Sequence, residues 1–161
     1  MNVLIALGAN VNTKNRAGFT PFHYALESKN RNLRSLETLF QHGANINSKD
    51  NLGYTALHIA CRSASSDIIN FLIDNGADIN APTKKYSECG VNCWAGYTPL
   101  MMATVRNNVE AVNALLENGA QRYLRDQNDP AALDIAQERE YLDRVEENKR
   151  QEIINLLKYS L

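Results

Sequence analysis

Apolar positions recur along the chain in a pattern that repeats several times. Small residues occupy one recurring position, at Ala25, Ala60 and Ala103. Pairs of larger apolar residues occupy a second, as Leu39 and Phe40, Leu72 and Ile73, and Leu115 and Leu116. We interpret the pairs as the apolar stripe of an amphipathic helix, and the alanines as the place where that helix, its partner and the next unit crowd together. The pattern therefore predicts pairs of short helices.

Two alternating strings carry this repetition. The first is GFTPFHYA at 18–25, GYTALHIA at 53–60, GYTPLMMA at 96–103 and a degenerate DPAALDIA at 129–136. The second is GANVN at 8–12, GANIN at 43–47, GADIN at 76–80 and a degenerate GAQRY at 119–123. In most repeats a second string begins 10 residues before a first string, and the next second string begins 23 residues after that first string. The period is therefore 33 residues. One connection, from Gly76 to Gly96, is longer by ten residues.

The predicted helices have recognisable ends. Thr20 and Thr98 precede Pro21 and Pro99. This order puts a capping hydroxyl before a proline at the first helical position, where no amide donor is lost. At the other end, a glycine that can adopt left-handed backbone follows each second helix, at Gly43, Gly76 and Gly119.

Together these strings resemble the ankyrin repeat, whose pattern is roughly D-x-x-G-x-T-P-L-H-x-A, two short antiparallel helices, and then L-L-x-x-G-A-D-x-N. The resemblance covers nearly the whole chain. It implies an all-α solenoid of stacked antiparallel helix pairs, with β-turn fingers that form, with the inner helices, a concave groove for protein partners. Each unit leaves an apolar face open on both flanks, so its stability must come from stacking on its neighbours.

We expect one ankyrin-repeat domain over 1–161, with about four and a half repeats. Its parts are a partial N-terminal repeat at 1–14, repeats at 15–49, 50–82 and 93–125, a finger insertion at 83–92, and a C-terminal capping repeat at 126–161. No first helix precedes Gly8, so the chain begins inside a repeat. If Met1 is an artificial start, at least one more repeat lies upstream.

The last repeat has nine more residues between its helices than the others have. This addition is heavily charged, and the segment 137–149 predicts lengthened helices. Glu146 and Arg150 stand four apart, in the favourable order for a helical ion pair. The apolar residues that we expect to close the core are Ile153, Ile154, Leu156 and Leu157.

Composition narrows the classes of function. The chain has 161 residues, 44% of them hydrophobic, a net charge of −1 and a pI near 6.3. It has no membrane-spanning run or secretory signal, so we expect an intracellular protein of the cytoplasm or nucleus with no membrane partner. We also expect a monomer. The low net charge also disfavours nucleic acid as a partner.

Asparagine is unusually frequent, with 20 residues against eight glycines. Asparagine tolerates left-handed backbone better than most residues and bonds to its own turn. We therefore predict that these residues serve helix ends and tight turns.

Candidate catalytic residues are few, and we predict no enzyme activity, cofactor or metal. For His23 and His58 the resemblance implies a structural bridge between the backbones of neighbouring turns, a role that the methionine at 101 cannot take in the third copy. Cys89 and Cys93 lie in the insertion, and the three cysteines are an odd number. They could bind a metal or form a reversible disulfide, but free thiols are favoured because no ligand spacing accompanies them.

The ankyrin pattern also marks the positions that do not build the scaffold. The predicted partner-binding residues at these positions are Lys14, Arg16, Phe19, Lys49, Leu52, Tyr54, Arg62, Trp94, Tyr97, Arg106, Arg125 and Gln127. Ala17, Glu27, Asn51 and Val105 fall at the same positions. Cations and aromatics dominate the set, and Tyr, Trp and Arg are enriched among binding hot spots. We therefore expect a protein or peptide partner, acidic or rich in aromatics.

Four readings of this set stay open. The fingers bind a partner, or they are solvated charged turns that keep a repeat array soluble. A third reading is the targeting or autoinhibitory segment of a larger signalling enzyme or pathogen effector. A fourth is a small stand-alone ankyrin inhibitor of another enzyme.

Overall fold

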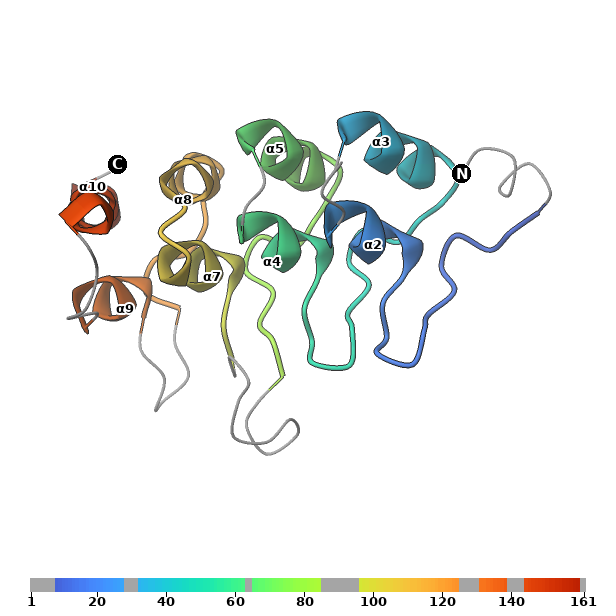
Figure 1. The fold of residues 1–161 in the computed structure, drawn as a ribbon, viewed down its shortest axis with the longest axis horizontal. Helices are drawn as coiled ribbons and strands as arrows, with labels where there is room; N and C mark the ends of the chain where they lie inside the picture. Colours follow the sequence, from blue (N-terminus) through green and yellow to red (C-terminus); the bar gives the residue numbers. More distant parts are fainter. Residues whose placement is uncertain are drawn as a thin grey trace.

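The computed structural model describes residues 8–27, 32–62, 65–84, 96–124, 131–138 and 144–159. Within these ranges, eight helices form four antiparallel pairs and no residue forms a strand (Figure 1). The pairs are α2 (Pro21–Glu27) with α3 (Leu33–Gln41), α4 (Ala56–Cys61) with α5 (Ser66–Asp74), α7 (Pro99–Val105) with α8 (Val109–Glu117), and α9 (Ala132–Glu138) with α10 (Arg144–Tyr159).

The helices lie in two rows (Figure 1). The inner row contains the first helix of each pair, and α4 packs between α2 and α7, which in turn packs against α9. In the outer row α8 packs between α5 and α10. The fingers extend from the inner row on the side away from the outer row. The all-α solenoid predicted from the sequence is confirmed.

The hydrophobic core lies between the rows and between successive pairs. The leucines of the predicted stripe, Leu39, Leu72 and Leu115, are fully buried, and so are Ala60 and Ala103. Each buried leucine stabilises the fold by about 2 kcal/mol relative to an exposed one. Because the helices pack against neighbouring pairs as well as within their own pair, part of this free energy depends on the stacking.

The predicted helix starts are confirmed at α7. Thr98 is its N-cap, and the Thr98 hydroxyl accepts a hydrogen bond from the Met101 amide at 3.3 Å, with Pro99 in the first turn. Two outer helices, α3 and α8, begin with asparagine caps, whereas the N-cap of α5 is Ser65. The side-chain oxygens of Asn32 and Asn108 accept from the amides three residues on, as the N-caps of α3 and α8.

Glycine ends the outer helices as predicted. Gly43, Gly76 and Gly119 all have φ near +83° to +85°. At α3, the Gly43 amide donates to Phe40 O and the Ala44 amide donates to Leu39 O, which satisfies two of the last helical carbonyls. The equivalent pairs of bonds close α5 and α8.

Successive fingers are joined edge to edge by backbone hydrogen bonds. The Asn51 amide donates to Ala17 O, and the Lys84 amide donates to Leu52 O, both at 3.0 Å. Inside the fingers that the structure describes at these bonds, the turn is closed in the same way each time. The Asp50 amide, for example, donates to Tyr54 O at 2.9 Å.

The long connection keeps this geometry at its base. The Thr83 amide donates to Tyr97 O, and the Tyr97 amide donates to the Thr83 hydroxyl, so Thr83 takes the place of Asp50. Lys84 takes the place of Asn51 through its bond to the preceding finger. Thr83 and Lys84, which the sequence assigned to the insertion, therefore make the finger contacts of a regular repeat. Residues 85–95 are outside the described ranges, including Cys89, Cys93 and Trp94.

The prediction that asparagines serve helix ends and tight turns is confirmed at several positions. Asn32 and Asn108 cap helices, and the side chains of Asn10, Asn15 and Asn45 accept from the amide two residues on. In the described part of the chain, Asn107 (φ +51°) is the one non-glycine residue with positive φ. Other asparagines join repeats. The Asn12 side chain donates to Gly43 O and accepts from the Asn45 amide, and Asn47 makes the same two bonds one repeat later, to Gly76 O and from the Asp78 amide.

The apolar residues of α10 join the core. Ile153, Ile154 and Leu157 are buried and Leu156 is half-buried, as predicted. Arg150 makes contacts that its predicted helical pair with Glu146 did not suggest. Its guanidinium donates to the carbonyls of Ala136 and Gln137, both at 2.6 Å, and pairs with Glu147 at 3.0 Å. The side chain of Glu146 lies outside the described set. Arg150 therefore caps the end of α9.

The contacts between fingers predict that replacing glycine with alanine costs more stability at Gly53 than at Gly76. Gly53 and Gly76 share φ +85°, so alanine is strained at both, by about 1 to 2 kcal/mol. A Cβ at Gly53 would also lie 2.5 Å from the Lys84 backbone nitrogen, whereas at Gly76 it would meet no described atom within 4 Å. Gly53→Ala should therefore lower the urea midpoint clearly more than Gly76→Ala does. Equal midpoints would show that the fingers do not approach this closely.

Candidate functional site

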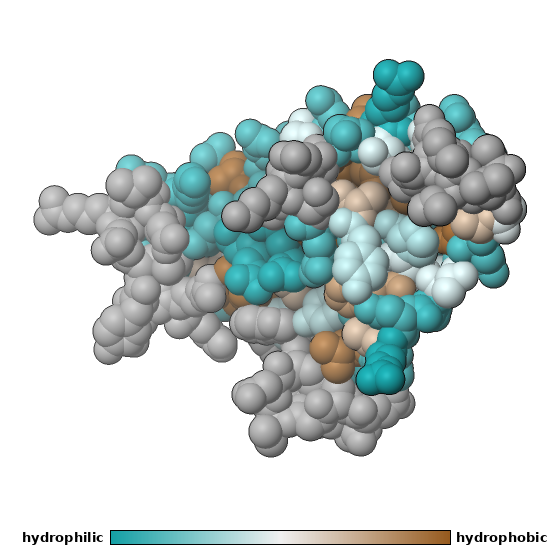
Figure 2. Space-filling model, turned by 45° about the vertical axis from the view of Figure 1, so that its right-hand side comes forward, coloured by the Kyte–Doolittle hydropathy of each residue, from teal (hydrophilic) through white to brown (hydrophobic). Residues whose placement is uncertain are grey.

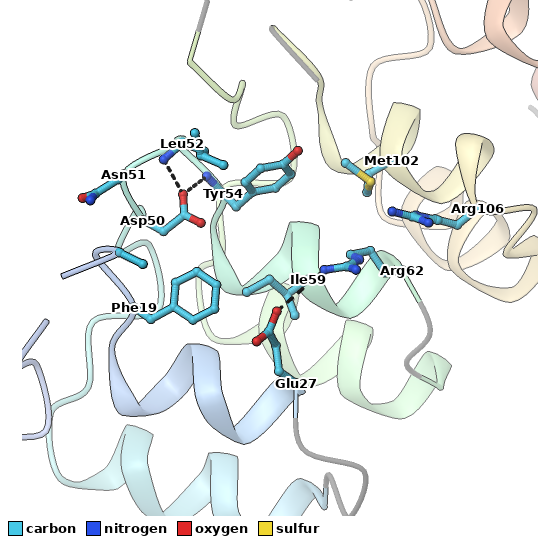
Figure 3. A pocket seen from close by; sticks show the side chains of 11 residues that line it. Phe19, Glu27, Asp50, Asn51, Leu52, Tyr54, Ile59, Arg62, Met102 and Arg106 are labelled. Atoms are coloured by element: carbon cyan, nitrogen blue, oxygen red, sulfur yellow. Dashed lines mark hydrogen bonds and ion pairs between the residues drawn. The ribbon is translucent and has the colours of Figure 1, made fainter. Parts of the chain in front are cut away.

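A groove of about 570 Å³ opens between the fingers and the inner helices (Figure 3). One wall consists of finger residues and the other of residues from the inner helices. The finger wall contains Ala17, Phe19, Asp50, Asn51, Leu52 and Tyr54, and the helical wall contains Glu27, Ile59, Arg62, Met102 and Arg106. In the space-filling view of Figure 2, apolar and weakly polar residues gather in the middle of one face, beside strongly polar ones.

Asp50 shapes the finger wall. Its buried carboxylate accepts hydrogen bonds from the amides of Leu52 at 2.9 Å and Tyr54 at 2.8 Å (Figure 3). These bonds hold the turn, so that Leu52 stays 42% exposed at the tip while Tyr54 is half-buried. Asn15 does the same in the preceding finger, where its side-chain oxygen accepts from the amides of Ala17 and Phe19, both at 2.9 Å.

The aromatic rings that line the groove pack against two buried histidines. The Phe19 ring stacks on His23 with 5.5 Å between ring centroids, and the Tyr54 ring meets His58 edge-on at 5.7 Å. Each histidine in turn bonds to the next finger. His23 Nε2 lies 3.3 Å from Tyr54 O and His58 Nε2 lies 2.9 Å from Tyr97 O. The bridge implied by the resemblance is confirmed at both sites.

The surroundings of His58 keep its ring neutral. Nδ1 accepts from the Thr55 amide at 3.2 Å, so the ring proton sits on Nε2, which donates to Tyr97 O. Burial lowers the pKa of His58 to about 4 because water cannot reach a charged ring there. Burial also lowers the pKa of His23. In the third repeat Met101 replaces the histidine. Its sulfur accepts from the Thr98 amide, but a thioether has no proton to donate onward.

The far end of the groove is charged. Arg62 pairs with Glu27 across α4 and α2 at 3.7 Å, and both side chains are partly exposed (Figure 3). Arg106, the C-cap of α7, lines the groove on the same side. A second hollow of about 420 Å³ adjoins this end. Its lining residues are Arg62, Ser65, Arg106, Asn107, Asn108, Glu110 and Lys149.

Five of the predicted partner-binding residues lie together in the groove. They are Phe19, Leu52, Tyr54, Arg62 and Arg106. Trp94, Arg125 and Gln127 lie outside the described residues.

Other predicted residues are engaged in joining the fingers. The ammonium groups of Lys14 and Lys49 donate to backbone carbonyls of the following finger, Lys49 O and Pro82 O. The carbonyl of Tyr97 accepts from His58, while the exposed Arg16 offers its carbonyl to the Asn51 side chain. These four do not line the groove. Whether any of them contacts a partner stays a prediction.

Three lining residues, Asp50, Ile59 and Met102, were missed from the sequence, and one assignment was wrong. Ile59 precedes Arg62 by three residues and Met102 precedes Arg106 by four, so each shares a helical face with a predicted arginine. That periodicity could have identified both. Val105, which the pattern placed among the exposed positions, is buried instead.

The site offers binding surface rather than reactive groups. Among the described residues, no three His, Cys, Asp or Glu side chains come close enough to hold a metal ion. Cys61 is fully buried, and burial raises the pKa of its thiol. Within the same ranges, no helix is both long enough and apolar enough to cross a bilayer.

The fold and its groove define a helical repeat array with a concave face. Comparison with protein families agrees with this. A family model for ankyrin repeats, in three copies, matches residues 1–83, more than half of the chain, and a model for a single ankyrin repeat matches residues 95–127. The chain therefore belongs to the ankyrin-repeat family, whose members are generally protein–protein interaction modules and typically not enzymes. A search of curated proteins finds no match.

The neutral His58 predicts a specific loss of stability in acid. In the unfolded chain the ring takes up a proton as the pH falls below about 6.5, whereas in the native state it stays neutral down to about 4. The unfolded state then binds more protons, so the free energy of unfolding falls across this window, by up to about 3 kcal/mol. Above pH 6.5 this stabilisation is fully present.

Urea unfolding from pH 7.5 to 4 measures this loss. A His58→Gln variant should be less stable at neutral pH and should show a shallower decline in acid. Parallel curves for the two proteins would contradict the assigned role.

Proposed function

We propose that this chain is a non-enzymatic interaction module that binds a segment of another protein in the groove between its fingers and inner helices. The observation that carries this is the apolar lining of the groove, with Leu52 exposed at its rim and Phe19, Tyr54, Ile59 and Met102 behind it. Contiguous apolar surface with a few directed charges is typical of binding sites.

The rigidity of the walls supports the same function. The finger turns are fixed by Asp50 and Asn15, and the fingers are joined through Asn51 and Lys84. The aromatic rings pack against buried histidines rather than hanging free in solvent. A preorganised surface loses little conformational entropy on docking, so more of the contact energy appears as affinity.

The charges at the end of the groove support a partner of matching chemistry. The arginines at 62 and 106 can bind carboxylates in a bidentate manner, and the finger aromatics can contact apolar or aromatic side chains. The proposal is therefore a protein or peptide partner that is acidic or rich in aromatics. The odd number of cysteines is consistent with a reducing compartment, the cytoplasm or nucleus.

Replacing Leu52 with serine tests the groove. The Leu52 side chain is exposed and the finger is held by its backbone, so the fold should remain while apolar contact with a partner is lost. Affinity for a partner captured from cell extract and then purified should fall about tenfold. Calorimetric titration of wild type and variant measures this.

Tyr123→Ser is the matched control. Tyr123 is 71% exposed and lines a separate hollow, so its loss removes apolar surface of similar size outside the groove. Wild-type affinity is expected for this variant. Unchanged affinity on Leu52→Ser, or an equal loss on both variants, would rule out the groove as the binding site.

A further inference from the structure

Arg106 lies where the two hollows meet. It lines the apolar groove and also the second hollow, which Lys149 of α10 borders. Among the described residues, Arg62 is the only other one that lines both, and its guanidinium already pairs with Glu27. Within the described part of the chain no carboxylate lies within ion-pair distance of the Arg106 side chain or of Lys149. Two cations therefore stand without a described counter-charge at one end of an apolar groove.

The carboxylates that line the two hollows are engaged elsewhere or stand apart. Asp50 holds its own finger turn through two backbone amides. Glu27 is on Arg62. Glu110 lies in the first turn of α8, where the partial positive charge of a helix start favours a carboxylate, and it forms no ion pair with a described residue. The charge left for a ligand at this end is therefore positive.

From this arrangement we infer that the occupant of the groove is a peptide with two adjoining parts, a bulky apolar side chain and, within a few residues, an Asp or Glu. The apolar side chain occupies the space between Phe19, Tyr54 and Met102, and the carboxylate binds Arg106 with help from Lys149 or Arg62. This rests on the proposed function and specifies its partner.

Glu27 acts as a selectivity residue in this scheme. A peptide carboxylate and the Glu27 carboxylate compete for the Arg62 guanidinium, so each acidic contact on Arg62 requires the existing pair to open. Because the pair is partly exposed and 3.7 Å long, opening it costs little. Removing the Glu27 charge should therefore tighten the binding of acidic peptides and leave neutral ones unaffected.

The test is a selection of random linear peptides displayed on phage against the full chain and against its Arg106→Glu variant. The Arg106 side chain is exposed and the cap bonds of α7 use its backbone, so the variant should fold, which a thermal melt checks. Peptides selected on wild type should combine a large apolar residue with Asp or Glu. Those selected on the variant should keep the apolar residue and lose the acidic preference.

Titration of one selected peptide gives the magnitudes. Arg106→Gln should weaken it about fivefold at low salt, and exchanging the peptide's acidic residues for amides should have the same effect. Glu27→Gln should strengthen it, while Arg34→Gln, on the outer helix α3 and outside both hollows, should change nothing.

The outcomes separate the two proposals. Apolar enrichment without acidic residues, or equal acidic enrichment on Arg106→Glu, would overturn this inference and leave the groove function standing. Recovery of no groove-dependent peptide, with Leu52→Ser selecting the same set as wild type, would overturn both.

Discussion

Hydrogen bonds that cross from one finger to the next are the constraint on which this structure depends. In the described part of the chain, two fingers each donate one backbone amide to the preceding finger, from Asn51 to Ala17 and from Lys84 to Leu52. A neutral buried histidine on an inner helix also donates to a backbone carbonyl of the following finger, as His58 does to Tyr97 O. Core packing alone would stack the helix pairs. The crossing bonds fix how the turns between the pairs are aligned, and the groove is made from those turns.

The same bonds explain why the binding surface is rigid. Polar groups in the fingers are used by neighbouring fingers, as the Lys14 ammonium is by Lys49 O. Among the residues that line the groove, the side chains that remain available are therefore the apolar ones and the arginines at the helix ends. A side chain that bonds to a neighbouring finger is less available to a partner. The residues that build the scaffold therefore differ from those that can bind. A groove with fixed walls can select a partner by the order of its apolar and acidic residues.

Much of this fold could be predicted because the repeat makes local signals add up. Helix caps such as Thr98 and helix-ending glycines such as Gly76 act within a few residues and are visible in the sequence. Contacts between repeats were harder. Asn47 and Lys49 bond to groups about thirty residues away, and Arg150 reaches back to another helix. Those partners are backbone carbonyls, which every residue has, so no side-chain pattern marks them.

Amide hydrogen exchange at Asn51 and Lys84 tests the central claim most directly. Both residues are in exposed turns, where an isolated finger would exchange at nearly the rate of an unfolded chain. If the fingers are joined as described, both amides should be protected nearly as strongly as those of α4 and α7, and Gly53→Ala should remove the protection at Lys84 first. Exchange at the unprotected rate in the native wild-type chain would contradict the account.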